Sequence, residues 1–216
     1  MTPRTSALMR PVMFTMLLLT AGGSNARAER APLQIFFAEA PALLVQVDGE
    51  PVYARVERTG LERITNTKAL IVRDPAGIYY LRLHDCWMES YALGGEWSVS
   101  GVSPFGENTA AERAAVAPLR AQESEAGLAS TPPTIFVVTT PAALVVTDGP
   151  PRYVTVPGTG LQYLANTRSK VYLEPTDQEL YVGVGGRSYR AWTTDGPWDF
   201  VSASDLPRDI AIEMAR

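Results

Sequence analysis

The chain has little of what most catalytic and metal centres require. It holds one cysteine, Cys86, and one histidine, His84, in 216 residues. A single thiol cannot form a disulfide within the chain, and a zinc site needs three or four protein ligands, most often cysteine and histidine. We therefore expect no metal, no cofactor and no disulfide framework, so that the burial of apolar surface must stabilise the fold.

Long apolar runs are also scarce. Residues 12–21 (VMFTMLLLTA) form an apolar stretch of about ten residues, and a bilayer span needs roughly 20. Arg4 and Arg10 precede it, and Ala26-Arg27-Ala28 follows with the small-x-small pattern that signal peptidase cleaves. The pattern predicts a signal peptide at 1–28, an exported protein that is periplasmic or extracellular, and no membrane span in the mature chain.

Basic clusters are missing too. Removing residues 1–28 takes away three arginines and changes the net charge from 19 − 23 = −4 to 16 − 23 = −7. An acidic surface without a cluster of lysine and arginine argues against nucleic acid and anionic lipid as partners.

What the sequence does contain is an internal repeat. Sliding the chain by 100 residues places 32–73 over 132–173 without a gap, and 17 of these 42 positions are identical. Beyond residue 73 we expect the offset to drift to 102 and then 101, which would place Trp87 on Tyr189 and Trp97 on Trp198. The repeat predicts two diverged copies of one module, copy 1 at 29–107 and copy 2 at 131–216.

Each copy has the signals of short strands. Runs such as 43–47 and 78–83 are rich in branched and aromatic residues, with turn signals about every ten residues. Asp48-Gly49 and Asp148-Gly149 sit between two such runs, as expected of a tight hairpin turn. We predict an all-β protein, with two tandem small antiparallel modules that are each a sandwich, an open barrel or a propeller-like sheet.

The segment at 108–130 differs in composition. It is rich in alanine and glutamate, Thr109 and Glu112 have capping-box spacing, and Pro118 is expected to end the helical run. We predict a linker with a short helix followed by a flexible acidic stretch at 122–129. The chain closes at 206–212 with either one helical turn or an extended tail.

The duplication separates shared positions from private ones. Residues kept in both copies are required by the module or by a function that both modules share. Short polar side chains and glycines at such positions suit turns and backbone capping, and a tryptophan after a turn suits the end of a small core. We assign these positions to the framework: Asp48, Gly49, Gly60, Asn66, Trp97, Asp148, Gly149, Gly160, Asn166 and Trp198.

His84, Asp85 and Cys86 belong to copy 1 alone. A histidine beside a thiol can activate it, and in a strand His84 and Cys86 would share a face while Asp85 points away. Copy 2 has Gly186, Arg187 and Ser188 in that region. We favour a half-buried Cys86 that fills a strand position over a functional thiol.

The aromatic side chains are the remaining candidates for ligand contact. Rings exposed on a sheet can stack on sugar or peptide, although core packing is the more common role of such residues. The candidates for ligand binding are Trp87, Tyr91, Tyr189 and Trp192. Tyr91 and Trp192 are the better pair, because they are not matched one-to-one in the alignment above.

The repeat resembles a family of exported bacterial proteins with reiterated modules of the form DG-P, GTGL, NT, YY, GRWF, GPW and LP. Copy 2 carries most of it, in Thr147–Pro151, Pro157–Leu161, Gly186–Ala191, Asp195–Trp198 and Leu206-Pro207. Copy 1 departs at His84–Trp87 and at Gly95-Glu96-Trp97. The resemblance implies export and, through a label that some members carry, carbohydrate binding; it implies no catalytic residues.

Three functions stay open. The first hypothesis is a non-catalytic exported binding protein that recognises cell-envelope glycan or a protein partner, and it predicts exposed rings at similar places in both copies. The second is a structural or assembly component of the envelope, and it predicts a broad apolar patch or exposed sheet edges. The third is a hydrolase with a serine or carboxylate site, although no Gly-x-Ser-x-Gly motif or phosphate-binding glycine loop is present. We favour a non-enzymatic function.

Overall fold

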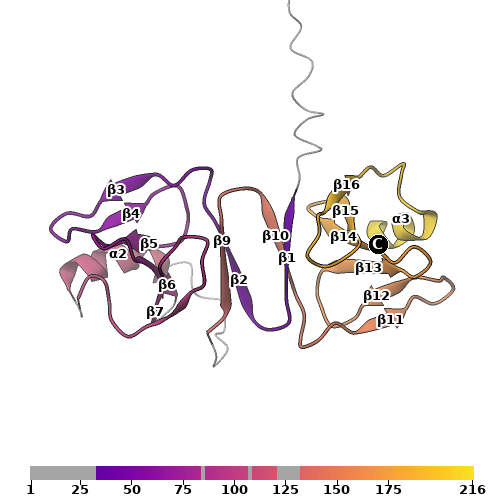
Figure 1. Cartoon of the computed structure of the whole chain (residues 1–216), viewed down its shortest axis with the longest axis horizontal. Helices are drawn as coiled ribbons and strands as arrows, with labels where there is room; N and C mark the ends of the chain where they lie inside the picture. Colours follow the sequence, from indigo (N-terminus) through magenta and orange to yellow (C-terminus); the bar gives the residue numbers. More distant parts are fainter. Residues whose placement is uncertain (1–32, 84–85, 107–108, 121–131) are drawn as a thin grey trace, which may run out of the picture. The chain divides into compact units, whose positions relative to one another are not determined.

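The computed structural model describes residues 33–83, 86–106, 109–120 and 132–216. The predicted signal peptide, His84, Asp85 and the acidic stretch at 122–129 lie outside these residues. The described residues form two β modules joined by a short helix, as predicted (Figure 1).

Copy 1 and copy 2 contain the same series of eight strands. Copy 1 holds β1 (Gln34–Ala38), β2 (Ala42–Gln46), β3 (Tyr53–Arg55), β4 (Glu62–Ile64), β5 (Ile71–Arg73), β6 (Tyr79–Leu83), β7 (Cys86–Ser90) and β8 (Ser98–Ser100). Copy 2 holds β9 (Thr134–Val138), β10 (Ala142–Val146), β11 (Tyr153–Thr155), β12 (Gln162–Leu164), β13 (Lys170–Glu174), β14 (Glu179–Val184), β15 (Arg187–Ala191) and β16 (Asp199–Val201). Helix α2 (Ala110–Arg120) follows copy 1, and α3 (Arg208–Ala215) follows the last strand.

The last six strands of each copy form an antiparallel meander. The sheet order is β3-β4-β5-β6-β7-β8 in copy 1 and β11-β12-β13-β14-β15-β16 in copy 2. Alternate residues of each sheet face two different cores, as the period of two requires. Val72, Tyr80 and Trp87 face one side of the copy 1 sheet, and their neighbours Ile71, Leu81 and Met88 face the other.

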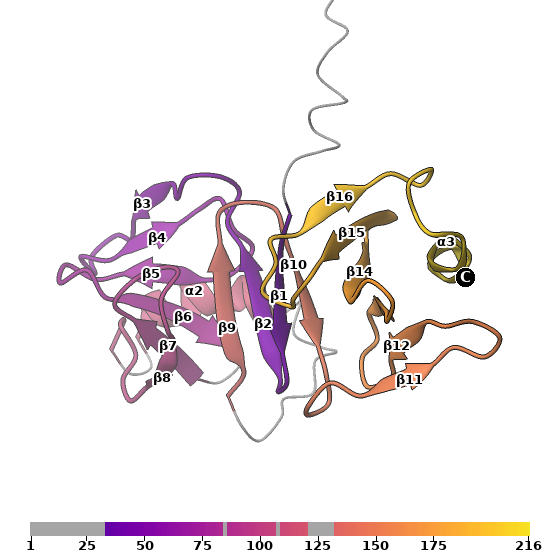
Figure 2. The ribbon, with the colours of Figure 1, turned by 45° about the vertical axis from the view of Figure 1, so that its right-hand side comes forward.

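The first two strands of each copy pair with the other copy. β1 runs parallel to β10, and β2 runs parallel to β9 (Figures 1 and 2). The registers are equivalent, since Gln34 pairs with Ala142 and Ala42 pairs with Thr134. Phe36 and Phe136, which occupy the same repeat position, stack at 4.5 Å between ring centroids. The two copies therefore exchange strands about a pseudo-two-fold axis.

This exchange completes the inner core of each copy, which is the core on the side of the sheet that faces these parallel strands. The inner core of copy 1 contains Ile135 and Val137 from β9, beside its own Val45, Ile71 and Leu81. The inner core of copy 2 contains Ile35 from β1, beside Val145, Leu164 and Val182. Each inner core therefore contains side chains from both copies.

A helix covers the outer face of each sheet. On copy 1, Val116 of α2 packs into a core with Leu70, Tyr80 and Phe105. On copy 2, Ile210 of α3 is fully buried against Leu161 and Tyr181. The predicted linker helix is therefore also a packing element of copy 1, and the C-terminal segment forms the corresponding helix of copy 2.

Both helices extend further than the sequence indicated. Thr109 Oγ1 accepts a hydrogen bond from the Glu112 amide at 3.1 Å, as the capping spacing predicted. The helix continues two residues past Pro118, which we expected to end it. Proline removes one backbone donor, but the contacts of Glu112 and Val116 with the sheet hold the preceding turns.

The turn at Asp48-Gly49 differs from the hairpin that we expected. Gly49 and Gly149 do have positive φ, at 75° and 76°. However, the strands on either side do not pair with each other, because β2 pairs with β9 and β3 pairs with β4. The segment instead carries the chain from the exchanged strands to the meander.

Candidate functional site

The strand registers align the two copies more closely than the sequence did. Leu81 pairs with Met88 in copy 1, and Val182 pairs with Tyr189 in copy 2, so the offset across β6–β8 is 101. Trp87 therefore corresponds to Ser188, and Tyr189 corresponds to Met88. The expected match of Trp87 with Tyr189 was wrong by one residue, which in a strand exchanges the two faces.

Trp87 lies on the outer face of copy 1, where it is 4% exposed. Its ring packs on Phe105 at 5.6 Å, and its Nε1 donates to Glu112 Oε1 at 3.0 Å. Arg82 stacks over the ring at 5.4 Å. These contacts fix α2 on the sheet and leave no ring face for a ligand.

Tyr189 lies on the inner face of copy 2, where it is 3% exposed. It meets Phe200 of the neighbouring strand edge to face, with ring centroids 6.1 Å apart. Two of the four aromatic candidates, Trp87 and Tyr189, are thus part of the two cores.

Tyr91 and Trp192 are the exposed candidates. Tyr91 is 84% exposed and Trp192 is 67% exposed. Each is the first residue after a strand end, β7 for Tyr91 and β15 for Trp192, and the preceding Ser90 and Ala191 occupy equivalent register positions. The two rings are therefore a matched pair, which corrects the alignment that left them unmatched.

The turns that carry these rings are built by short hydrogen bonds. Ser90 Oγ donates to the Ala92 carbonyl at 2.8 Å, and the Gly95 amide donates to the same carbonyl at 3.0 Å. In copy 2 the Gly196 amide donates to the Thr193 carbonyl at 3.1 Å. Each turn then leads to the tryptophan that we assigned to the framework.

Those framework tryptophans pack as inner-core residues. Trp198 is buried in the inner core of copy 2, with Phe37 of β1 stacked on it at 5.8 Å. Trp97 is half-buried against the inner core of copy 1. The indole Nε1 of both is buried without a hydrogen-bond partner in the described part of the chain.

Asn66 and Asn166 cap the same backbone loop in both copies. Asn66 Nδ2 donates to the carbonyls of Asp48 at 2.7 Å and Glu50 at 2.8 Å, and its Oδ1 accepts from the Val52 amide at 2.9 Å. Asn166 makes the corresponding contacts in copy 2. Two open cavities of about 760 and 730 Å³ lie beside these loops, but the asparagines are already engaged by backbone.

The glycines of the next turn differ between copies. Arg58 and Gly158 both have positive φ, at 63° and 81°, whereas Gly60 has φ +74° and Gly160 does not have positive φ. Thr59 and Thr159 hold both turns in the same way, accepting from the amide two residues ahead and donating to the carbonyl three residues back.

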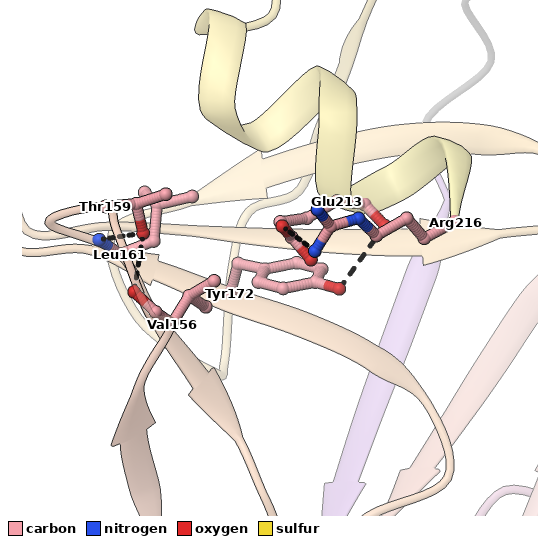
Figure 3. A network of polar contacts seen from close by, with 6 residues as sticks. All are labelled: Val156, Thr159, Leu161, Tyr172, Glu213 and Arg216. Carbon is pink, nitrogen blue, oxygen red and sulfur yellow. Dashed lines mark hydrogen bonds and ion pairs between the residues drawn. The ribbon is translucent and has the colours of Figure 1, made fainter.

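Figure 3 shows the C-terminal end of copy 2. Tyr172 Oη donates to the Glu213 carbonyl at 3.4 Å, and Arg216 pairs with the Glu213 carboxylate at 2.7 Å. Arg216 is largely exposed, and the group holds α3 in place beside the Thr159 turn. The arrangement is that of a structural contact.

Cys86 is half-buried, and its Sγ donates to the Leu83 carbonyl at 3.3 Å. It packs against the inner core of copy 1, as a strand-filling residue would. Among the residues that the structure describes, no three histidine, cysteine or acidic side chains are grouped so that they could hold a metal ion.

Comparison with known proteins finds no family model, no curated protein and no solved structure that matches the chain. Within the described ranges, none of the helices is long and apolar enough to span a membrane.

Proposed function

We propose that the chain is a non-catalytic binding protein that contacts a repeating glycan of the cell envelope through Tyr91 and Trp192. The observation that supports this is the presence of an exposed aromatic ring at the same position in both copies. A single exposed ring needs no explanation. A ring retained twice, in copies whose cores have diverged, is best explained by a function that both copies share.

Neither ring has a packing role that would account for its retention. Both project from the end of a strand, and the cores are filled by other residues. Tyrosine and tryptophan combine an apolar face with a polar edge and lose little conformational entropy on binding, which suits them to recognition surfaces. The apolar face of a sugar ring is a natural partner for such a surface.

A polymer of repeated units fits a pair of equivalent sites. Each ring alone offers a small contact, but two sites on one ligand raise the apparent affinity through effective concentration. An envelope glycan presents such repeats, and it would be within reach of a protein exported by the predicted signal peptide.

The test is co-sedimentation with purified peptidoglycan. We expect the wild type to be retained, Tyr91→Ala and Trp192→Ala each to bind about tenfold more weakly (about 1.4 kcal/mol), and the double variant to be lost from the pellet. The matched control is Tyr163→Ala, which removes a ring that is 39% exposed and has Arg63 as its copy 1 counterpart.

Circular dichroism should show the same fold for all variants, because each change lies on the surface. The proposal fails if the wild type is not retained, or if the double variant sediments as well as the wild type does. Equal loss in the Tyr163→Ala control would point to non-specific adhesion and would also count against it.

A further inference from the structure

Copy 1 contains a cavity beside its inner core. It has a volume of about 650 Å³ and is lined by residues of β1, β7 and β9 and of the turn at Gly94–Val99. This volume is within the range of small-molecule sites in proteins. β9 belongs to copy 2, so the exchanged strand supplies part of the wall.

Three aliphatic residues in the wall have smaller side chains than their counterparts in the other module. They are Met88 of β7, Val99 of β8 and Val137 of β9. Their counterparts around the inner core of copy 2 are Tyr189 and Phe200 of that copy and Phe37 of β1, as the strand registers show. All three counterparts are aromatic.

In copy 2 these rings occupy the corresponding space. Tyr189 and Phe200 pack edge to face at 6.1 Å, and Phe37 stacks on Trp198 at 5.8 Å. In copy 1, Val99 is 51% exposed and Trp97 is only half-buried. Because aromatic side chains occupy this region in copy 2, we expect an aromatic ring to fit the cavity of copy 1.

The rim of the copy 1 cavity also differs in charge. Glu96 lies at the rim, is exposed, and corresponds to Pro197 in copy 2. Among the described residues that line the cavity, Glu96 is the one that carries a charge. Trp97 and Phe36 line the same cavity as this carboxylate, and the combination favours a cation, through direct attraction and cation–π contact.

We propose that this cavity binds a small aromatic amine, with the ring against Trp97 and Val99 and the ammonium group next to Glu96. The site is separate from the exposed rings of Tyr91 and Trp192, neither of which lines it. Its carboxylate, Glu96, is private to copy 1, because Pro197 stands at that position in copy 2.

The test is isothermal titration of the full chain with 2-phenylethylamine. We expect saturable binding at one site, at least tenfold weaker binding of hexylamine, which has no ring, and several-fold weaker binding of 3-phenylpropionate, which has the opposite charge. Glu96→Gln should remove the preference for the amine over the acid and leave ring binding in place.

The decisive variant carries Val99→Phe and Val137→Phe. Phe200 and Phe37 stand at these positions around the inner core of copy 2, so the fold has already accommodated both rings once, and they should abolish binding by filling the cavity. Trp192→Ala should bind the amine as the wild type does, which separates this site from the proposed glycan site. No saturable binding by the wild type, or undiminished binding by the filled variant, would overturn the proposal.

Discussion

Copy 1 and copy 2 have equivalent loops but differ in the side chains of their inner cores. The capping asparagines, the threonine turns and the strand registers correspond residue by residue. The buried inner core of copy 2 includes the rings of Tyr189 and Trp198, whereas that of copy 1 is aliphatic and lies beside a cavity. Short polar side chains therefore hold the backbone framework in both copies. The size of the core side chains can differ, because each sheet is still covered by the exchanged strands on one face and by a helix on the other.

A second contrast lies on β3–β6. In copy 1, Glu62 pairs with Arg73 at 2.6 Å, Arg73 lies over the Tyr53 ring, and Tyr53 shares a hydrogen bond with Tyr79 at 3.0 Å. The corresponding residues of copy 2 are Tyr153, Gln162, Leu173 and Leu180. Copy 1 thus has a polar network at these positions, whereas copy 2 has Gln162, Leu173 and Leu180 beside Tyr153.

The strand exchange predicts crossed effects of core mutations, and these should be the largest. Ile135→Ala removes a buried side chain from the inner core of copy 1 and should cost about 3 kcal/mol. Ile35→Ala should do the same to copy 2. Hydrogen exchange should show lost protection in β4–β7 for Ile135→Ala and in β12–β15 for Ile35→Ala. If each change weakens the copy in which it lies by sequence, the exchange is wrong.

The shared loops predict equal effects in both copies. Asn66→Ala removes three hydrogen bonds to backbone and Asn166→Ala removes four, the fourth a long one at 3.4 Å, so each should cost about 2 kcal/mol. Chemical denaturation measures the loss. Asp48→Ala, at an exposed side chain of the same loop, is the control and should change stability by less than about 0.5 kcal/mol. A clearly unequal pair would mean that the two loops are not equivalent.

The two helices are attached differently, so that removing the glutamate of α2 should destabilise the protein more than removing that of α3. Glu112 of α2 accepts from Trp87 Nε1 and from Ser103 Oγ. Glu112→Ala should cost about 1.5 kcal/mol and raise hydrogen exchange in α2. Glu213→Ala removes a carboxylate that pairs with an exposed arginine and should cost about 0.5 kcal/mol. Equal losses at the two sites would contradict the assignment of Glu112 as the anchor of α2.

The tyrosine pair predicts the smallest effect, at alkaline pH. Burial and the hydrogen bond with Tyr79 raise the pKa of Tyr53 to about 12, whereas burial alone raises the pKa of Tyr153. An unfolded tyrosine has a pKa of about 10, so the neutral Tyr53 contributes stability below that pH, and this contribution is lost as the pH rises through 12.

Tyr79→Leu introduces the residue of copy 2 and should lower the pKa of Tyr53, so that the loss of stability between pH 10 and 12 becomes shallower. The ultraviolet absorbance of tyrosinate follows the titration, and thermal unfolding at each pH follows the stability. An unchanged pKa of Tyr53 in this variant would show that the hydrogen bond with Tyr79 does not raise it.

The sequence was sufficient for the repeat, the strands, the turn glycines and the capping asparagines, because each has a local cause. It could not predict the pairing of β1 with β10, since similar short apolar strands in the two copies satisfy the same pattern whichever copy they complete. It also misaligned Trp87 by one residue, because the match rested on aromatic character where the true counterpart, Ser188, is polar. That one-residue error concealed the pairing of Tyr91 with Trp192, and only the strand registers restored it.

The pseudo-two-fold arrangement of β1, β2, β9 and β10 has a consequence for how the protein can change. In a homodimer of single modules, every substitution appears twice, and a change that opens a cavity in one subunit opens it in the other. Joining both modules in one chain keeps their association independent of concentration and lets each half mutate separately. The covalent connection thus permits asymmetry, so that one half can keep a filled core for stability while the other gives up side-chain volume to a cavity.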